Sequence, residues 1–143
     1  MIALDTNVLV YAHRMDSAWN ERAARCVRAL AEGRTPWAIP WPCIHEFYAV
    51  VTHPRIYDPA STVDQAIEQI EVWLESPSVV LLSEGDSYWD ALKGTITAAR
   101  ISGAQVHDAR VAALCRVHGV RELWTADRDF SRFGDLRTSN PLV

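Results

Sequence analysis

Four carboxylates stand at positions where the local sequence pattern does not require a charge. Asp5 and Asp127 each follow a short apolar segment that reads as a strand, and Glu46 and Asp108 lie beside apolar positions in segments with helical spacing. Carboxylates that converge in a fold repel one another unless protons or hard cations neutralise them. Oxygen ligands without paired His or Cys favour Mg²⁺ or Mn²⁺ over Zn²⁺.

A converging set of such acids has the chemistry of phosphodiester hydrolysis. A bound divalent cation holds a phosphate oxygen and lowers the pKa of a water molecule, which becomes the nucleophile. A second cation, where present, stabilises the leaving oxygen, so no covalent enzyme intermediate is needed. The residue types therefore indicate a metal-dependent hydrolase.

Each acid also has a purely structural explanation that the local pattern leaves open. Asp5, or Asn7 two residues later, would be a good helix N-cap. Glu46 could pair with an arginine at the margin of the core, and Asp108 lies in a first helical turn, where the helix dipole favours a negative charge. Asp127 lies in a segment with the polar composition of a turn.

The elements that must position these acids alternate along the chain, which predicts an α/β fold with a mostly parallel sheet. Strands are expected at residues 2–4, 37–39, 79–82 and 120–125. Helices are expected at residues 20–31, from Pro42 towards Pro54, and at 62–75, 86–100 and 105–117. The helix 86–100 is expected to break or bend near Gly94, and the tail 136–143 to be extended.

A parallel sheet would bring these acids together. The carboxyl ends of parallel strands meet at one edge, where ligands bind in open α/β sheets. Asp5 and Asp127 should therefore emerge at the same edge. The helix that carries Asp108 leads into the strand before Asp127, so one of its ends should return there.

The charge balance neither excludes nor establishes nucleic acid binding. The net charge is −4, from 14 basic and 18 acidic residues, but without the four clustered acids the two signs would be equal in number. All basic residues except Lys93 are arginines, which suit bidentate contact with phosphate. A genome of biased base composition explains them equally well. The candidates for RNA phosphate contacts are Arg14, Arg55, Arg128 and Arg132.

Composition indicates a single domain spanning residues 1–143, soluble and cytoplasmic. No run approaches the roughly 18 apolar residues of a membrane span, and Asp5 interrupts the segment where a signal peptide would be apolar. The three cysteines are odd in number and not closely spaced, which favours reduced thiols in the core.

Five segments carry a resemblance to a known family: LDTNVLVYAHR, HEFYAVVTHPRIYDP, HDARVAALCRVHGV, LWTADRDFSRF and NPLV. They contain Asp5, Asn7, Glu46, Asp108, Thr125, Asp127 and Asp129. In this order and at these separations, the set resembles the PIN-domain ribonucleases, specifically the VapC-type toxins of toxin–antitoxin modules. The resemblance covers nearly the whole chain.

The resemblance implies a PIN-like three-layer α/β/α sandwich around a parallel sheet. It also implies cleavage of RNA by metal-activated water, with 3′-hydroxyl and 5′-phosphate ends and Mg²⁺ or Mn²⁺ as cofactor. Asp5, Asp108 and Asp127 would be metal ligands. Glu46 would bind the metal through water or help to activate the nucleophile.

The resemblance further implies supporting residues and partners. Asn7 and Thr125 would orient the carboxylates by hydrogen bonds, and Asp129 would lie at an outer position or at a second metal. A small VapB-like antitoxin would wrap the chain and place an arginine or other polar group in the acidic cleft. The RNA substrate would be a tRNA or rRNA loop, and the assembly a homodimer or a toxin–antitoxin hetero-oligomer.

The candidate interface is the predicted helix from Thr62 to Glu75 with Trp73. Its apolar face at helical spacing comprises Val63, Ile67, Ile70 and Leu74. Core packing explains this stripe as well as a partner does.

Two other functions compete with the nuclease. A phosphohydrolase of the haloacid dehalogenase kind would use Asp5 as a nucleophile, but it normally has a second aspartate where this chain has Asn7, and Lys93 would have to be its lysine. The alternative from another class is a catalytically silent PIN-like module that binds RNA or protein. Loss of an acid would mark it, yet all four acids are present.

Overall fold

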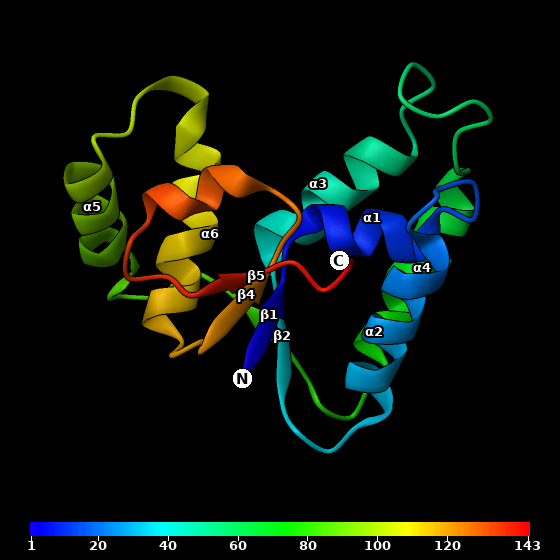
Figure 1. Ribbon diagram of the computed structural model, residues 1–143, viewed down its shortest axis with the longest axis horizontal. Coiled ribbons are helices and arrows are strands. Elements are labelled where there is room, and N and C mark those ends of the chain that lie inside the picture. Colours follow the sequence, from blue (N-terminus) through cyan, green and yellow to red (C-terminus); the bar gives the residue numbers. More distant parts are fainter.

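A five-stranded sheet lies at the centre of the protein (Figure 1). The computed structural model describes residues 1–143. In spatial order the strands are β3 (Val79–Leu82), β2 (Trp37–Pro40), β1 (Ile2–Leu4), β4 (Glu122–Trp124) and β5 (Thr138–Ser139). Every neighbouring pair is parallel, so the predicted α/β class is confirmed and the sheet is parallel throughout.

Helices cover both faces of this sheet and complete a three-layer α/β/α arrangement. They are α1 (Thr6–His13), α2 (Asn20–Glu32), α3 (Trp41–Val51), α4 (Val63–Leu74), α5 (Tyr88–Ala99) and α6 (Val106–Val117). Two short 3₁₀ helices, η1 (Gly103–Gln105) and η2 (Arg128–Arg132), precede α6 and follow β4. Figure 1 shows α5 and α6 on one side of the sheet and α1, α2 and α4 on the other.

Local sequence signals explain three of the helix ends. Thr62 and Gln65 form a reciprocal capping box at the start of α4: the Thr62 hydroxyl accepts from the Gln65 N–H at 3.1 Å, and the Gln65 side chain accepts from the Thr62 N–H at 2.9 Å. Pro42 lies in the first turn of α3, where its missing N–H is tolerated. Gly119 follows α6 with a φ of +66°, a conformation that favours glycine.

Three boundaries differ from the sequence-based expectation. Helix α5 starts at Tyr88 and runs unbroken through Gly94, because the cost of one glycine, about 1 kcal/mol, is small beside the packing of α5 on α6. Strand β4 is shorter than the predicted segment 120–125. The expected turn after β4 is instead a 3₁₀ helix, η2, for which Asp127 is the N-cap.

The predicted apolar face of α4 is buried only in part: Ile70 packs against the core, and the other three members are exposed. Val63, Ile67 and Leu74 are 55%, 43% and 37% exposed, whereas Ala66 and Trp73 are buried. The helix rotates so that its largest side chain enters the core, because an aromatic ring buries the most apolar area. Trp73 packs edge-on against the ring of Phe47 on α3, with ring centroids 4.8 Å apart. Trp73 therefore belongs to the core and not to an interface.

The three cysteines are free, as expected, and Cys43 and Cys115 are buried. No helix combines the length and apolar character needed to cross a membrane.

Candidate active site

The carboxyl ends of the central strands bring the predicted acids to one edge of the sheet. Asp5 and Thr125 immediately follow the paired strands β1 and β4. Helix α3 begins directly after β2, and α6 begins at the same edge, so that its first turn presents Asp108 there. All four predicted acids line one pocket of about 210 Å³: Asp5, Glu46, Asp108 and Asp127.

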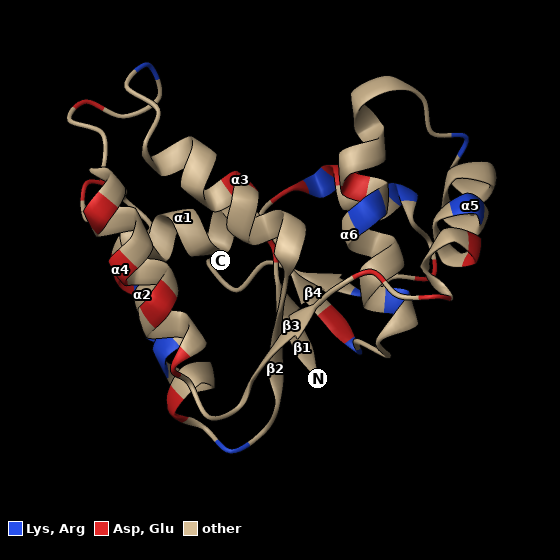
Figure 2. Cartoon of the chain, turned by 180° about the vertical axis from the view of Figure 1, so that it is seen from behind, with Lys and Arg blue, Asp and Glu red and all other residues tan.

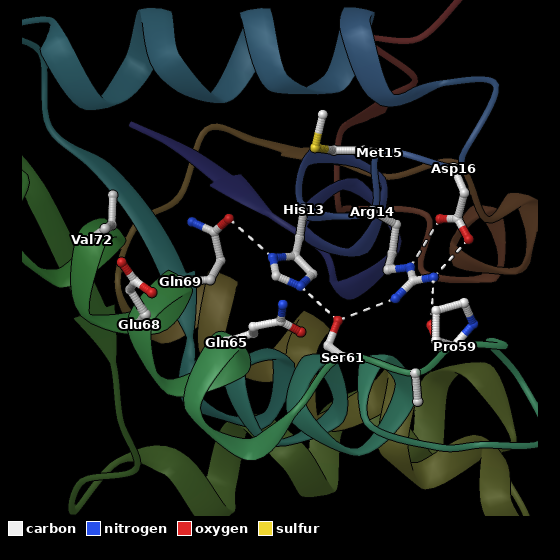
Figure 3. A pocket seen from close by; sticks show the side chains of 11 residues that line it. His13, Arg14, Met15, Asp16, Pro59, Ser61, Gln65, Glu68, Gln69 and Val72 are labelled. Atoms are coloured by element: carbon white, nitrogen blue, oxygen red, sulfur yellow. Dashed lines mark hydrogen bonds and ion pairs between the residues drawn. The ribbon is translucent and has the colours of Figure 1, made fainter.

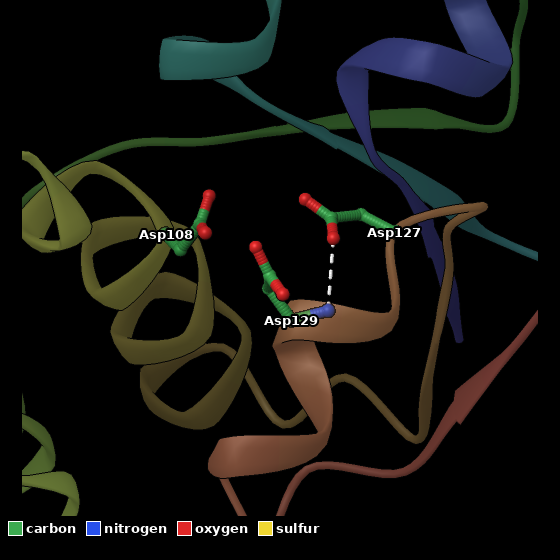
Figure 4. A group of neighbouring side chains, drawn as sticks. All are labelled: Asp108, Asp127 and Asp129. Carbon is green, nitrogen blue, oxygen red and sulfur yellow. Dashed lines mark hydrogen bonds between the residues drawn. The ribbon is translucent and has the colours of Figure 1, made fainter.

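Three carboxylates are close enough to share a cation. Oxygens of Asp108, Asp127 and Asp129 all lie within 4.8 Å of one another (Figure 4). Oxygens on opposite sides of a Mg²⁺ ion are about 4 Å apart, so this spacing fits a common ion. Asp5 and Glu46 line the same pocket but lie outside this group. Asp129 belongs to this group but is exposed and does not line the pocket, which is compatible with both expected places, an outer position and a second metal.

Hydrogen bonds fix the carboxylate of Asp5. Its Oδ2 accepts from the Thr125 hydroxyl at 2.8 Å and from the Asn7 side-chain amide at 3.3 Å. The same hydroxyl accepts from the Asn7 amide at 3.3 Å and from the Asp127 N–H at 3.0 Å. The Asn7 side-chain oxygen Oδ1 accepts from the Ala126 N–H at 3.0 Å. This network joins the ends of β1 and β4.

Capping does not explain Asp5. It occupies the N-cap position of α1, but its side chain makes no capping hydrogen bond. Its Oδ1 instead accepts from the Cys43 thiol at 3.7 Å, a contact that the sequence analysis missed because it treated Cys43 as a core filler. The available signal was helical spacing, since Cys43 lies three residues before Glu46 on α3.

The electrostatics of the pocket disfavour ionised acids. Burial raises the pKa of Asp5. Lost hydration, and then the charge of Asp127, raise the pKa of Asp108. Glu46 is exposed at the pocket margin, yet partial loss of hydration and then the charge of Asp108 raise its pKa too. The negative charge of the cluster is therefore not balanced by nearby positive charge, and either bound protons or a cation would neutralise it.

These residues fit a hard divalent cation. The donors facing the pocket are carboxylate oxygens, the ligands that Mg²⁺ and Mn²⁺ prefer. Burial raises the pKa of the Cys43 thiol well above its usual range, so in the metal-free protein this sulfur stays protonated and donates to the Asp5 carboxylate.

The four predicted RNA-contact arginines differ in availability. Arg55 and Arg128 are exposed and form no ion pair. The Arg132 Nε donates to the backbone oxygen of Asp129 at 3.0 Å, which places its charge beside the cluster. Arg14 is already paired with the carboxylate of Asp16.

We expect the metal-free protein to lose stability as the pH rises from about 4 towards 7. A carboxyl whose pKa is raised on folding binds its proton more tightly in the folded state, so the folded state holds more protons across this window. The free energy of unfolding then falls with rising pH until the raised pKa values are passed. The raised pKa values of Asp5, Glu46 and Asp108 predict this direction, which thermal unfolding in EDTA at several pH values measures.

Asp127→Asn should raise the metal-free melting temperature at pH 7, because it removes the charge that raises the pKa of Asp108 while keeping an oxygen to accept from the Asp129 N–H. The matched control is Asp135→Asn, since Asp135 is exposed and paired with Arg116 away from the pocket. A melting temperature unchanged or lowered by Asp127→Asn would contradict the repulsion between the carboxylates of Asp127 and Asp108.

Comparisons with known proteins agree on one family. A family model described as "PIN domain" matches residues 2–136. Ribonuclease VapC48 of Mycobacterium tuberculosis is 30% identical over 138 residues, which cover 96% of this chain and 95% of that protein.

Two solved structures share the fold. VapBC2 from Rickettsia felis, solved bound to a DNA fragment from its promoter, aligns with a TM-score of 0.70 and 20% identity over 98% of both chains. VapC20 of M. tuberculosis, described as a toxin that cleaves the sarcin–ricin loop, aligns with a TM-score of 0.64 and 18% identity over 92% of this chain and 93% of that one. At these identities the structural likeness concerns the fold.

Proposed function

The chain belongs to the PIN-domain family, with VapC ribonucleases among its relatives, and from this premise we propose that it is a metal-dependent endoribonuclease toxin of a VapBC-like type II toxin–antitoxin system. One observation carries the proposal: Asp5, Glu46, Asp108 and Asp127 reach one pocket from four separate segments. The proposal assigns the whole activity to a single PIN-like domain, residues 1–143, acting in the cytoplasm.

The acids have distinct parts in this proposal. Asp5, Asp108 and Asp127 would hold Mg²⁺ or Mn²⁺, with Asp129 at an outer position or at a second metal. When bound, the cation neutralises phosphate charge and makes a water molecule more acidic. Glu46 either contacts the metal through water or accepts a proton from the attacking water. Its raised pKa suits a base, because general bases work best with a pKa near the working pH.

The reaction is hydrolysis with no covalent enzyme intermediate. Water attacks phosphorus, the bond between phosphorus and the 3′ oxygen breaks, and that oxygen takes up a proton. The products are a 3′-hydroxyl and a 5′-phosphate. Asn7 and Thr125 contribute by holding the Asp5 carboxylate in place.

The proposed partners are an RNA substrate, from tRNA or rRNA, and a VapB-like antitoxin. The structural likeness to VapBC2 supports the antitoxin. Helix α4 leaves Val63 and Ile67 exposed, and Figure 2 shows acidic residues along the same helix. An antitoxin segment with apolar and basic side chains would complement this surface. A homodimer or a toxin–antitoxin hetero-oligomer is the proposed assembly.

The test is cleavage of a mixed cellular RNA pool by the purified protein. We expect cleavage with Mg²⁺ or Mn²⁺, none in EDTA, and products whose 5′ ends can be ligated without added phosphate. Cleavage that survives EDTA would reject the metal mechanism. RNA binding without cleavage under any metal would favour the silent binding module. Sequencing the ends formed in cells that express the protein would identify the target.

A further inference from the structure

Two tyrosines line the acidic pocket without a part in the hydrolysis. Tyr11 comes from α1, and Tyr57 from the loop 52–62 between α3 and α4. Val10 and Val50 line the same pocket. The lining therefore combines carboxylates, which suit a cation and a phosphate, with aromatic and apolar side chains, which do not.

The ring of Tyr57 is held by Arg14. The guanidinium carbon lies 4.2 Å from the ring centroid, in a cation–π contact. Two other bonds tie Arg14 to the same loop: it donates to the Pro59 carbonyl oxygen at 3.0 Å and to the Ser61 hydroxyl at 3.3 Å (Figure 3). Asp16 fixes the guanidinium in turn by accepting from Nε at 2.9 Å and from Nη2 at 2.6 Å.

The second anchor of this loop is His13. Its Nε2 lies 2.9 Å from the Ser61 hydroxyl, and its Nδ1 lies 3.1 Å from the Gln69 side-chain oxygen (Figure 3). Consecutive residues at the end of α1 thus clamp both the loop and α4. Such pre-ordering lowers the entropy that a binding surface loses when it meets a ligand.

Arg14 holds the ring from outside the acidic pocket. It lines the neighbouring polar cavity with His13 and Asp16, and it does not line the acidic pocket that Tyr57 borders. The Arg14 side chain is 11% exposed and its charge is paired with Asp16. Its position therefore suits support of an aromatic wall better than the phosphate contact expected from the sequence.

We propose that Tyr57, positioned by Arg14, stacks on an unpaired base next to the scissile phosphate of the looped RNA expected as substrate, with Tyr11 as a second aromatic contact. This inference rests on the proposed nuclease function and adds a base-contacting residue and its positioning residue to it. Bases within a duplex have both faces covered by neighbouring pairs, whereas an unpaired base can stack on an aromatic side chain. Stacking of this kind tolerates different bases, so it selects conformation before sequence.

The first test measures RNA binding without cleavage. Asp108→Asn protein is titrated into a short, unstructured, fluorescein-labelled RNA in Mg²⁺, alone and combined with Tyr57→Leu or Tyr57→Phe. Tyr57→Leu should weaken binding about tenfold or more, and Tyr57→Phe should have little effect because it keeps the ring. Trp89→Leu is the control, since it removes an aromatic ring that is 60% exposed on α5. Equal affinities of the leucine and phenylalanine variants, with both folded, would overturn the stacking.

The second test locates the base. Single abasic positions are scanned through the same RNA, and each is measured with Tyr57 and with Tyr57→Leu. We expect one position beside the cleaved bond at which the abasic change weakens binding only when Tyr57 is present. If the base at that position contacts Tyr57, removing the base after the ring is already gone costs nothing further, so the two losses of binding free energy do not add. Equal losses with both proteins at every position would overturn the inference. A duplex of the same sequence should bind much more weakly, and equal binding of duplex and single strand would overturn the substrate class.

The third test concerns Arg14 as a positioning residue. In the cleavage-competent protein, Arg14→Met should raise KM as Tyr57→Leu does, leave kcat nearly unchanged, and speed amide hydrogen exchange in the loop 52–62. The slope of log Kd against log salt should not change, because the guanidinium is paired with Asp16. A slope lower by about 1 would show that Arg14 contacts phosphate and would contradict the positioning role. A lower melting temperature without a change in KM would contradict it too.

Failure of this inference is distinguishable from failure of the nuclease proposal. Metal-dependent cleavage whose KM is unchanged by Tyr57→Leu rejects the stacking and retains the nuclease proposal. Binding that depends on Tyr57, without cleavage in any metal, rejects the nuclease and retains the stacking.

Discussion

Asp108→Asn protein should fold normally and cleave RNA at least about a hundredfold more slowly than the unaltered protein. The Asp108 carboxylate, like that of Asp127, belongs both to the three-carboxylate group and to the pocket lining. It shares the 4.8 Å group with Asp127 and Asp129, and it shares the pocket with Asp5 and Glu46. Replacing one charged oxygen ligand by an amide weakens cation binding, and even changes beyond the ligands themselves cost ten- to a hundredfold in metal sites.

Initial cleavage rates across a Mg²⁺ titration measure this effect, and Mn²⁺ binding to the RNA-free protein gives a readout independent of activity. Asp135→Asn makes the same chemical change at an exposed position paired with Arg116 and should cleave at the unaltered rate. A folded Asp108→Asn protein with a normal rate and normal Mn²⁺ affinity would remove Asp108 from the site.

Phe47→Ala should cost about 3–5 kcal/mol of the free energy of unfolding, a loss in the highest range expected for a single core truncation. Phe47 is 0% exposed, and its ring packs edge-on against Trp73 of α4 at 4.8 Å and against His13 of α1 at 5.3 Å. One side chain thus joins three helices. Its truncation leaves a cavity that rigid helices fill poorly, so the cavity cost adds to the lost burial.

Urea denaturation in EDTA measures this cost without a contribution from bound metal. Phe47→Leu is the matched variant: it keeps most of the buried volume and should lose less than half as much stability. Ile56→Ala, at a 53% exposed position, removes comparable apolar atoms outside the core and should have little effect. A loss below about 1 kcal/mol for Phe47→Ala would show that α1, α3 and α4 do not depend on this contact.

The sequence could predict the placement of Asp5, Asp108 and Asp127 because a general rule of parallel sheets governs it. The carboxyl ends of β1 and β4 lie at one edge, and the helix before β4 must begin at that edge. Apolar runs and capping residues located these elements to within a few residues. No knowledge of individual side-chain contacts was needed.

The rotation of α4 could not be predicted from its own residues. Val63, Ile67 and Leu74 form an apolar stripe as regular as the one that includes Ala66 and Trp73, and local spacing does not rank the two. Which face of α4 is buried depends on whether the core has room for the indole ring of Trp73 beside Phe47. That space is set by the packing of α3 and not by the residues of α4. Tertiary packing therefore decided it.

The partners of Arg14 and the exact position of Asp129 within the site were equally out of reach. Arg14 looked available for phosphate, but its partners include Ser61, 47 residues away in the chain. Asp129 enters the acidic group because η2 turns it towards Asp108, where an open turn was expected. Contacts of this kind depend on loop conformation, which composition and periodicity do not encode.

The hydrogen-bonded bridge between Asn7 and Thr125 has a consequence for how the protein is made. These residues are 118 positions apart, and the strand that brings Thr125 into place pairs directly with the first strand of the chain. A ribosome must therefore deliver almost the entire polypeptide before the pocket exists, since domains fold as units as the chain emerges. A fragment that ends before β4 therefore lacks Thr125 and Asp127 and cannot form the acidic pocket.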